Sequence, residues 1–313
     1  MTESSSSPPQ NDELLRALEL VALLHVRGTD RDRASVAERH IAQGASPAAG
    51  LRIAGLDERL ASFLEAAPPH DVASSLANTA RALAARDHAV FARRLAAWHG
   101  LSAALPAIGL AAIARWVVLP AVDVMRQASS VVSPTDVAWM SVLTLVAFAT
   151  SATASGLLVA VARGAAIPAT GGEVIAAHDR ATVLTGVSAL TAVGINVIAA
   201  LRASARLTPG SPVAVAALTA ADAFEKGAPV PEAALTTLLP AHGASLVNGA
   251  LAHNVGAVVV PALADDAVVS AARASSHGLP FVRFACLLVA GIAVLVSALA
   301  VMLSYAGTQA GAL

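Results

Sequence analysis

Two histidines and an asparagine in the second half of the chain are the side chains best suited to bind a metal or move a proton. They are His242, His253 and Asn254. Most metal sites use three or four ligands, and no carboxylate or cysteine lies near these residues in the sequence. A solvated or capping role therefore explains them better than catalysis does.

Sequence motifs of common enzymes do not occur in the chain. The single lysine, Lys226, lies between Glu225 and Gly227, whereas a phosphate-binding loop needs Ser or Thr after its lysine. The zinc-protease motif HExxH and the nucleophile motif GxSxG are absent. We therefore predict that the protein is not an enzyme and that it has no catalytic residue, metal ligand or cofactor.

Polar groups inside apolar stretches are the next candidates. Arg115 interrupts such a stretch, and charge within a membrane is usually functional. Because Pro120 follows closely, the arginine can also extend to the membrane surface, which is the simpler interpretation. A second set of hydroxyl groups could line a proton path or serve helix packing, and we favour packing: Thr144, Thr150, Ser151, Thr153 and Ser155.

Four arginines precede the first long apolar stretch and form a loose basic cluster: Arg81, Arg86, Arg93 and Arg94. Such clusters contact anionic lipid headgroups, and they can also dock an acidic partner. The sequence leaves both alternatives open, with lipid contact favoured.

The amino-acid composition indicates whether these groups lie in water or in a membrane. The chain has 313 residues, of which 56% are hydrophobic and only 13% are charged, and its mean hydropathy is +0.68. Soluble domains carry about 25% charged residues, so a membrane protein is predicted. The net charge of −1 argues against nucleic-acid binding. Cys286 is the only cysteine, which excludes a disulfide framework.

Three stretches are apolar enough to span a bilayer, which takes about 20 residues. Placing arginines on the inner side gives three spans with the N-terminus in the cytoplasm. The predicted order is a disordered tail (1–11), cytoplasmic helical domain 1 (12–99), a first span (100–120), a short periplasmic loop (121–136), a second span (137–163), cytoplasmic helical domain 2 (164–280), a third span (281–306) and a periplasmic tail (307–313). A fourth apolar stretch, Ala181–Leu201, is diluted by polar residues, and we exclude it from the spans.

The two cytoplasmic segments are predicted to be helical. Leu14, Leu18, Val21 and His25 share one helical face in a helix closed by Gly28, and a second helix is predicted from Thr29 to Gly44. No stretch shows the period-two alternation of a strand. The predicted fold class is an all-α membrane protein.

A repeated pattern links the two segments. IAQGASPAAGL around Gly44 and FEKGAPVPEAAL around Gly227 each place Gly-Ala between a helix end and a proline-containing restart. Each is followed, at a similar distance, by His-Gly-Leu at the entrance of a span, at His99 and at His277. This order predicts two homologous cytoplasmic helical bundles, each leading into a span.

The arrangement resembles the type II secretion system protein F family, the inner-membrane platform proteins of type II secretion and type IV pilus systems. LTAVGINVIAALRAS resembles the first-helix motif of that family at Gly194, and FEKGAPVPEAAL resembles a later element at Gly227. The family's G-E-x-x-G turn would fall at 252–256, where Gly256 matches and His253 replaces the glutamate. The structural repeat residues implied are Gly44, Gly194, Gly227 and Gly256.

The resemblance implies a scaffold in the bacterial inner membrane that couples a cytoplasmic assembly ATPase to the assembly of pilin or pseudopilin filaments. It also implies contacts with other inner-membrane assembly proteins, a homo-oligomer, and a buried bundle helix over Ala181–Leu201. Two alternatives stay open: an ion-conducting stator subunit of the flagellar-motor type, and a membrane scaffold of unassigned role.

Overall fold

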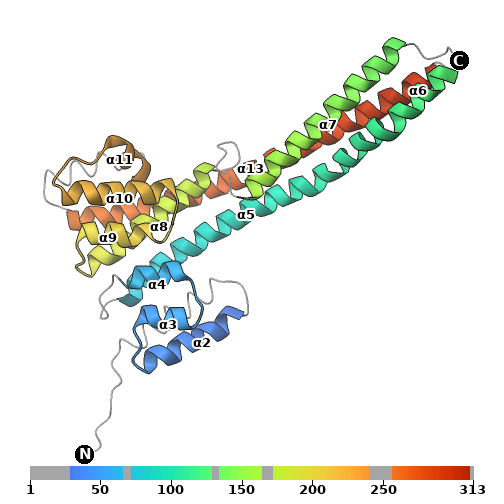
Figure 1. The fold of residues 1–313 in the computed structure, drawn as a ribbon. Coiled ribbons are helices and arrows are strands. Elements are labelled where there is room, and N and C mark those ends of the chain that lie inside the picture. Colours follow the sequence, from blue (N-terminus) through green and yellow to red (C-terminus); the bar gives the residue numbers. More distant parts are fainter. Residues whose placement is uncertain (1–28, 66–71, 129–133, 164–171, 240–255, 311–313) are drawn as a thin grey trace, which may run out of the picture. The chain divides into compact units, whose positions relative to one another are not determined.

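The computed structural model describes residues 29–65, 72–128, 134–163, 172–239 and 256–310, which form helices and no strands (Figure 1). The prediction of an all-α chain is confirmed for these residues. Two compact units are present: unit 1 is Met1–Ala89 with Glu173–Ser275, and unit 2 is Val90–Gly172 with Ser276–Leu313. The long helices α5 (Val72–Ile113) and α13 (Gly256–Ala310) contribute to both units.

The first helical segment of unit 1 contains α2 (Thr29–Ala42), α3 (Pro47–Ile53) and α4 (Glu58–Leu64). The predicted helix from Thr29 is confirmed, and it ends at Ala42. Gly44 has φ 94°, and the Ala45 N–H donates to the His40 carbonyl, as in a Schellman turn. Ser46 then caps α3 by accepting from the Ala49 N–H. The predicted helix before Gly28 lies outside the described residues.

The second helical segment contains α8 (Gly172–Ala192), α9 (Val197–Ala205), α10 (Pro212–Glu225) and α11 (Glu232–Leu238). The single buried helix expected over Ala181–Leu201 is wrong. Gly194, with φ 84°, follows the end of α8, and the Asn196 side chain caps α9. The left-handed glycine and the cap together break the helix although the stretch remains apolar.

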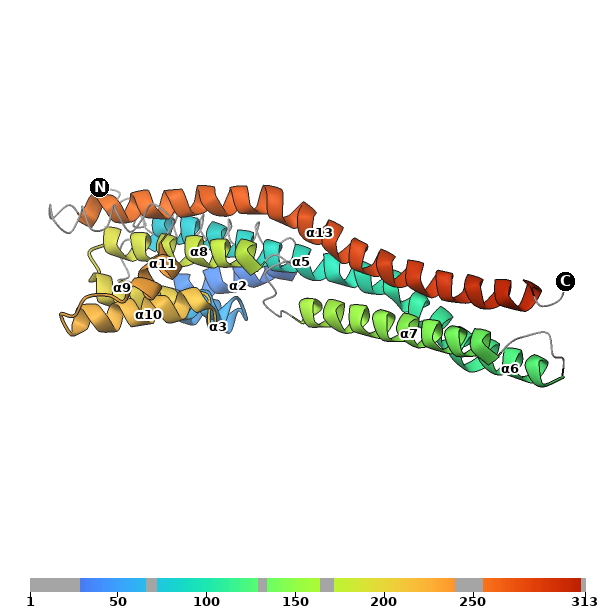
Figure 2. The ribbon, with the colours of Figure 1, turned by 90° about the horizontal axis from the view of Figure 1, so that it is seen from above.

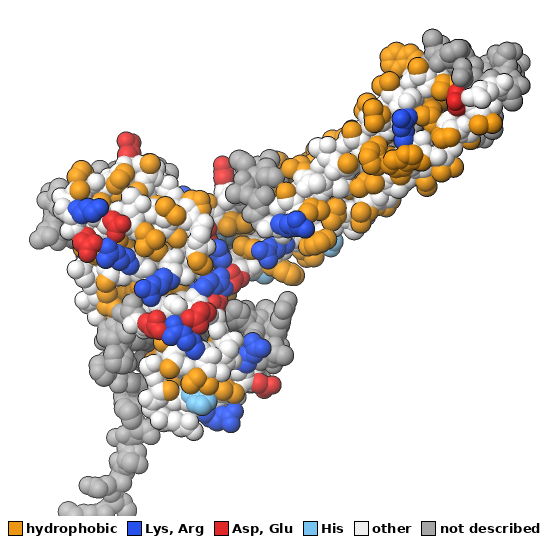
Figure 3. Space-filling model, viewed as in Figure 1, with side chains coloured by type: hydrophobic (Ala, Val, Ile, Leu, Met, Phe, Trp, Pro, Cys, Tyr) orange, Lys and Arg blue, Asp and Glu red, His pale blue; other side chains and the backbone are white. Residues whose placement is uncertain are grey.

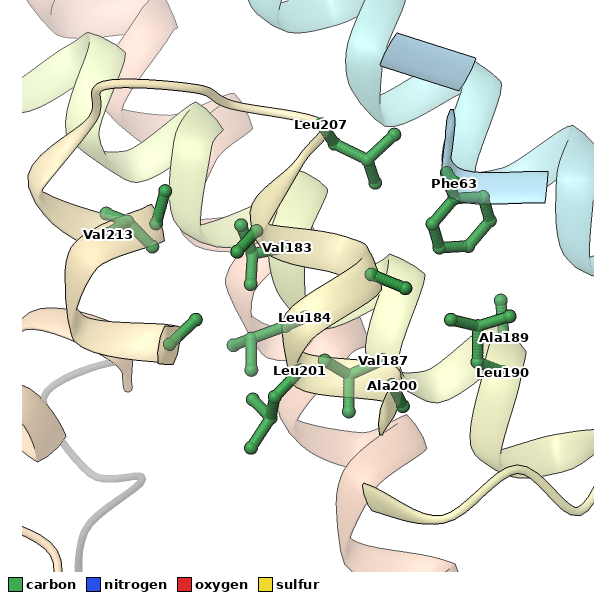
Figure 4. Close-up of a cluster of buried hydrophobic side chains, with 14 of the residues drawn as sticks. Phe63, Val183, Leu184, Val187, Ala189, Leu190, Ala200, Leu201, Leu207 and Val213 are labelled. Carbon is green, nitrogen blue, oxygen red and sulfur yellow. The ribbon is translucent and has the colours of Figure 1, made fainter. Parts of the chain in front are cut away.

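Both segments contribute to one hydrophobic core (Figure 4). Phe63 of α4 lies beside Leu207 and Leu190 of the second segment, and all three are buried. A Cβ on Gly186 of α8 would lie 3.1 Å from the Phe63 ring, so the absent side chain permits this approach. The large apolar side chains of the two segments are therefore buried against each other.

Unit 2 is a bundle of α7 (Pro134–Ala162) and the C-terminal parts of α5 and α13 (Figure 2). A π-helical turn (Ala114–Val118) and α6 (Leu119–Ala128) continue α5. Within the described ranges, three helices are long and apolar enough to cross a membrane, at Ala77–Val124, Val137–Ala162 and Val259–Leu303. The boundaries predicted at 99/100 and 280/281 fall inside the continuous helices α5 and α13.

Small residues fill the interior of unit 2. Along α13 the buried positions alternate between spacings of three and four: Cys286, Ala290, Ala293, Ser297 and Ala300. Residues from the three helices meet in layers, such as Ala107, Ala154 and Ala293. This spacing produces left-handed packing, and small side chains allow the close approach typical of membrane helices.

Large apolar side chains lie on the outside of unit 2, where Figure 3 shows many hydrophobic and few charged side chains. The three tryptophans of the chain are all exposed there: Trp98 at 58%, Trp116 at 62% and Trp139 at 68%. From Trp98 to Trp116 a helix rises about 27 Å, close to the thickness of the hydrocarbon core. Tryptophans gather at the two membrane surfaces, so unit 2 has the dimensions of a membrane bundle.

Candidate functional site: a charged junction in unit 1

Five charged side chains connect the two helical segments of unit 1, and we call them the charged junction. They come from α5, α8 and the start of α4: Asp57, Arg59, Arg86, Asp87 and Asp179. Arg86 forms an ion pair with Asp179, whose side chain is only 4% exposed, and lies 3.2 Å from an Asp87 oxygen. This pair joins α5 to α8 in the interior of the unit.

The α4 end of the junction is held by its own helix cap. Asp57 accepts from the Arg59 N–H at the start of α4 and also pairs with the Arg59 guanidinium. Arg59 Nη2 donates to Asp87 Oδ2 at 2.7 Å. Burial lowers the pKa of Arg59, but hydrogen bonds to Asp57 and Asp87 outweigh it and raise that pKa above its usual range. The arginine therefore remains charged and connects α4 with α5.

His178 precedes Asp179 and faces a different helix. Its Nε2 lies 2.6 Å from Ser275 Oγ of α13. Burial, together with Arg86 and His88, lowers the pKa of His178. Burial raises the pKa of Asp179, and Arg86 opposes that change.

A Ser–His contact raises the question of nucleophilic catalysis, which needs a third group to orient the histidine. Asp179 is committed to Arg86, and among the described residues no carboxylate hydrogen bonds to the His178 ring. The arrangement fits helix connection better than catalysis.

The four arginines predicted to contact lipid or a partner do not form one surface. Arg81 is exposed and donates to Asn78 Oδ1 at 3.2 Å, Arg86 belongs to the charged junction, and Arg94 is exposed. Arg93 is 3% exposed and lies within unit 2. Because an α-helix turns by about 100° per residue, neighbours along α5 face different surroundings.

The four glycines predicted as repeat residues occupy helix ends. Gly44, Gly194 and Gly227 have positive φ, and Gly256 is the first residue of α13. The N-cap follows two residues after Gly44 and after Gly194, whereas Pro231 follows Gly227 by four. Local geometry therefore pairs Gly44 with Gly194, not with Gly227 as the sequence comparison did.

Two arginines that were not singled out from the sequence support the correspondence between the turns at Gly44 and Gly194. Arg52 near the end of α3 pairs with Glu58 at 2.9 Å and with Glu65. Arg202 near the end of α9 pairs with Asp222 at 2.8 Å and with Glu225 at 2.6 Å. Each arginine stands eight residues after its turn glycine and ends the sequence Ala-x-Leu-Arg, which was the available signal.

Two polar contacts join different helices of unit 2, whereas Ser155 Oγ is buried without a hydrogen-bond partner. Arg115 donates to Ser141 Oγ at 2.8 Å, and Ser151 Oγ lies 2.9 Å from Ser297 Oγ in the buried interior. Of the predicted hydroxyl set, Thr144, Ser151 and Ser155 are buried, whereas Thr153 is exposed. These contacts agree with the packing interpretation.

No metal site occurs among the described residues, because they contain no group of three His, Cys, Asp or Glu side chains that could hold an ion. His242, His253 and Asn254 lie outside the described residues. A cavity of about 570 Å³ lies between α5, α8 and α13, with Arg81 and Asp265 among its lining residues.

No protein-family model matches the chain, and no curated protein is significantly similar to it.

Proposed function

We propose that the protein is a platform protein of a type II secretion or type IV pilus-like machine in the bacterial inner membrane. In this role unit 1 lies in the cytoplasm and binds an assembly ATPase, while unit 2 guides pilin or pseudopilin subunits out of the bilayer. Other inner-membrane assembly proteins and further copies of the chain complete the platform.

The continuity of α5 and α13 is the observation that carries the proposal. Each helix begins in unit 1 and ends in unit 2, without a break at the predicted membrane boundary. A continuous helix couples its two ends more directly than a flexible linker does, and α13 continues through Pro280, which removes one backbone hydrogen bond near the predicted boundary. The junction pairs α5 with α8 through Arg86 and Asp179, so motion in the second helical segment reaches α5 directly.

The stator alternative has one observation in its favour, the hydroxyl pair Ser151 and Ser297 inside the bundle. Ion transfer through a stator needs a membrane carboxylate, and the buried polar residues described in unit 2 are Arg93 and hydroxyl residues. A partner chain would have to supply the acid. A proton-flux assay in liposomes tests this alternative.

Deletion of the gene in the source cell tests the proposal. We expect loss of pilus-like filaments or secreted substrates, restored by the full chain, and co-purification of a hexameric assembly ATPase with the full chain in detergent. Unchanged filaments and secretion in the deletion strain would contradict the proposal.

A matched pair of insertions tests helix continuity. Two glycines inserted after Ala89, between the units along α5, should abolish filament assembly while ATPase binding is retained. The same insertion after Ser130, between α6 and α7, should be tolerated. Equal activity of both variants would show that continuity of α5 is not used.

A further inference from the structure

A groove of about 550 Å³ lies between α5 and α13 in unit 2. Its lining includes Leu95 and His99 of α5 with Arg283, Phe284 and Leu287 of α13. Three large apolar members of the lining are exposed, Leu95 at 42%, Phe284 at 62% and Leu287 at 44%. The groove is thus an apolar channel with two basic side chains beside it.

The ionisable side chains that line the groove are all basic. Its lining contains no acidic residue, and among the described residues no carboxylate pairs with Arg283. Arg283 is also the last charged side chain of the sequence. Because no described carboxylate pairs with this arginine beside an apolar channel, the groove favours a ligand with an anionic head and an apolar tail.

The depth of the groove agrees with this chemistry. Trp98 is next to His99 and is exposed at one end of the bundle, as expected at a membrane surface. Arg94 and Arg163, charged residues that flank the first two spans, are exposed at the corresponding ends of those spans. Arg283 is the third residue of the third predicted span (281–306) and is exposed there, where an arginine side chain can extend to the membrane surface.

We propose that this groove binds one anionic phospholipid. The Arg283 guanidinium and the His99 ring hold the phosphate, and one acyl chain lies along Leu95, Phe284 and Leu287. Basic pockets between membrane helices bind anionic headgroups by the same combination of charge and apolar contact. The inference does not depend on the platform function, because it uses only the bundle of unit 2.

Native mass spectrometry of the full chain, purified in detergent and titrated with phosphatidylglycerol or phosphatidylcholine, tests the proposal. We expect preferential retention of phosphatidylglycerol, and Arg283→Gln should weaken it about tenfold. Arg163→Gln removes an exposed arginine outside the groove and should leave retention unchanged. Arg283→Lys should restore part of the retention, because it keeps the charge.

Phe284→Ala tests the contact with the acyl chain separately, and it should reduce the retention of both lipids to a similar degree. Inorganic phosphate should not displace the lipid, since it lacks the tail. Equal retention of the two lipids by the wild type, or unchanged retention by Arg283→Gln, would overturn the proposal. So would capture of a partner's transmembrane segment in the groove, detected by crosslinking from Phe284→Cys.

Discussion

The two helical segments of unit 1 have turns of the same construction but place them in different surroundings. Gly44 and Gly194 both have positive φ and both precede a capping side chain by two residues. Of the α2 side chains that the structure describes, Ala37 alone is buried, whereas α8 is buried over most of its length. The same local chemistry therefore serves a peripheral helix and a central one.

The difference arises from the partners of α8. Asp179 binds α5, His178 contacts α13, and Gly186 admits Phe63 from α4. A turn depends on a few adjacent residues, but burial depends on which distant helices pack against each face. Substitutions at the contacts of α8 should therefore lower the free energy of unfolding more than matched substitutions at peripheral positions.

Loss of the Phe63 ring should have the largest effect. Phe63→Ala leaves a cavity where the two segments meet, and such changes cost about 3–5 kcal/mol. Phe224→Ala in α10, where the ring is 38% exposed, should cost much less. Thermal unfolding of both variants in detergent, followed by circular dichroism, measures the difference. Equal losses would show that Phe63 does not join the segments.

Removal of the buried charge at Asp179 should cause the second-largest loss of stability. Asp179→Asn leaves Arg86 without its buried partner, and breaking a buried pair costs about 3–5 kcal/mol. We expect about 2 kcal/mol here, because Asp87 still neutralises Arg86. Asp222→Asn changes an exposed pair and should leave the denaturation midpoint nearly unchanged. Denaturant titration of the two variants checks the comparison, which fails if their midpoints coincide.

Substitution of Gly44 and Gly194 by alanine tests whether the two turns have the same construction. No atom lies within 4 Å of a Cβ at Gly44 or Gly194, so the cost comes from the left-handed backbone. Each Gly→Ala change should cost about 1–2 kcal/mol, measured by denaturant titration. Gly109, with the same free space in a regular helix, should accept alanine without loss. Unequal losses at the two turns would contradict their shared construction.

The smallest effect should be a pH dependence centred on His178. Its folded pKa is lowered, so the unfolded chain takes up the proton first as the pH falls below the ordinary histidine value. Stability should therefore be full above about pH 6.5 and decrease below it. His178→Gln should reduce this decrease between about pH 7.5 and 5.5, while His277→Gln, at an exposed position, should not. Melting temperatures at the two pH values provide the measurement.

The sequence predicted features that depend on neighbours along the chain. It predicted the helix from Thr29 and three apolar spans, because periodicity and hydropathy are local. It missed the break at Gly194, since alanine-rich sequence around Asn196 resembles an uninterrupted helix. It also missed the pairing of Arg86 with Asp179, because nothing in the sequence shows which charges meet after folding.

Thiol labelling tests the central claim that both helical segments lie on one side of the membrane. In a Cys286→Ala background, single cysteines are placed at exposed positions of α2, α10 and α6 by Ser35→Cys, Glu225→Cys and Gln127→Cys. A membrane-impermeant maleimide applied to intact cells should label position 127 alone, and positions 35 and 225 should react only after lysis. Labelling of position 35 or 225 in intact cells would contradict the account.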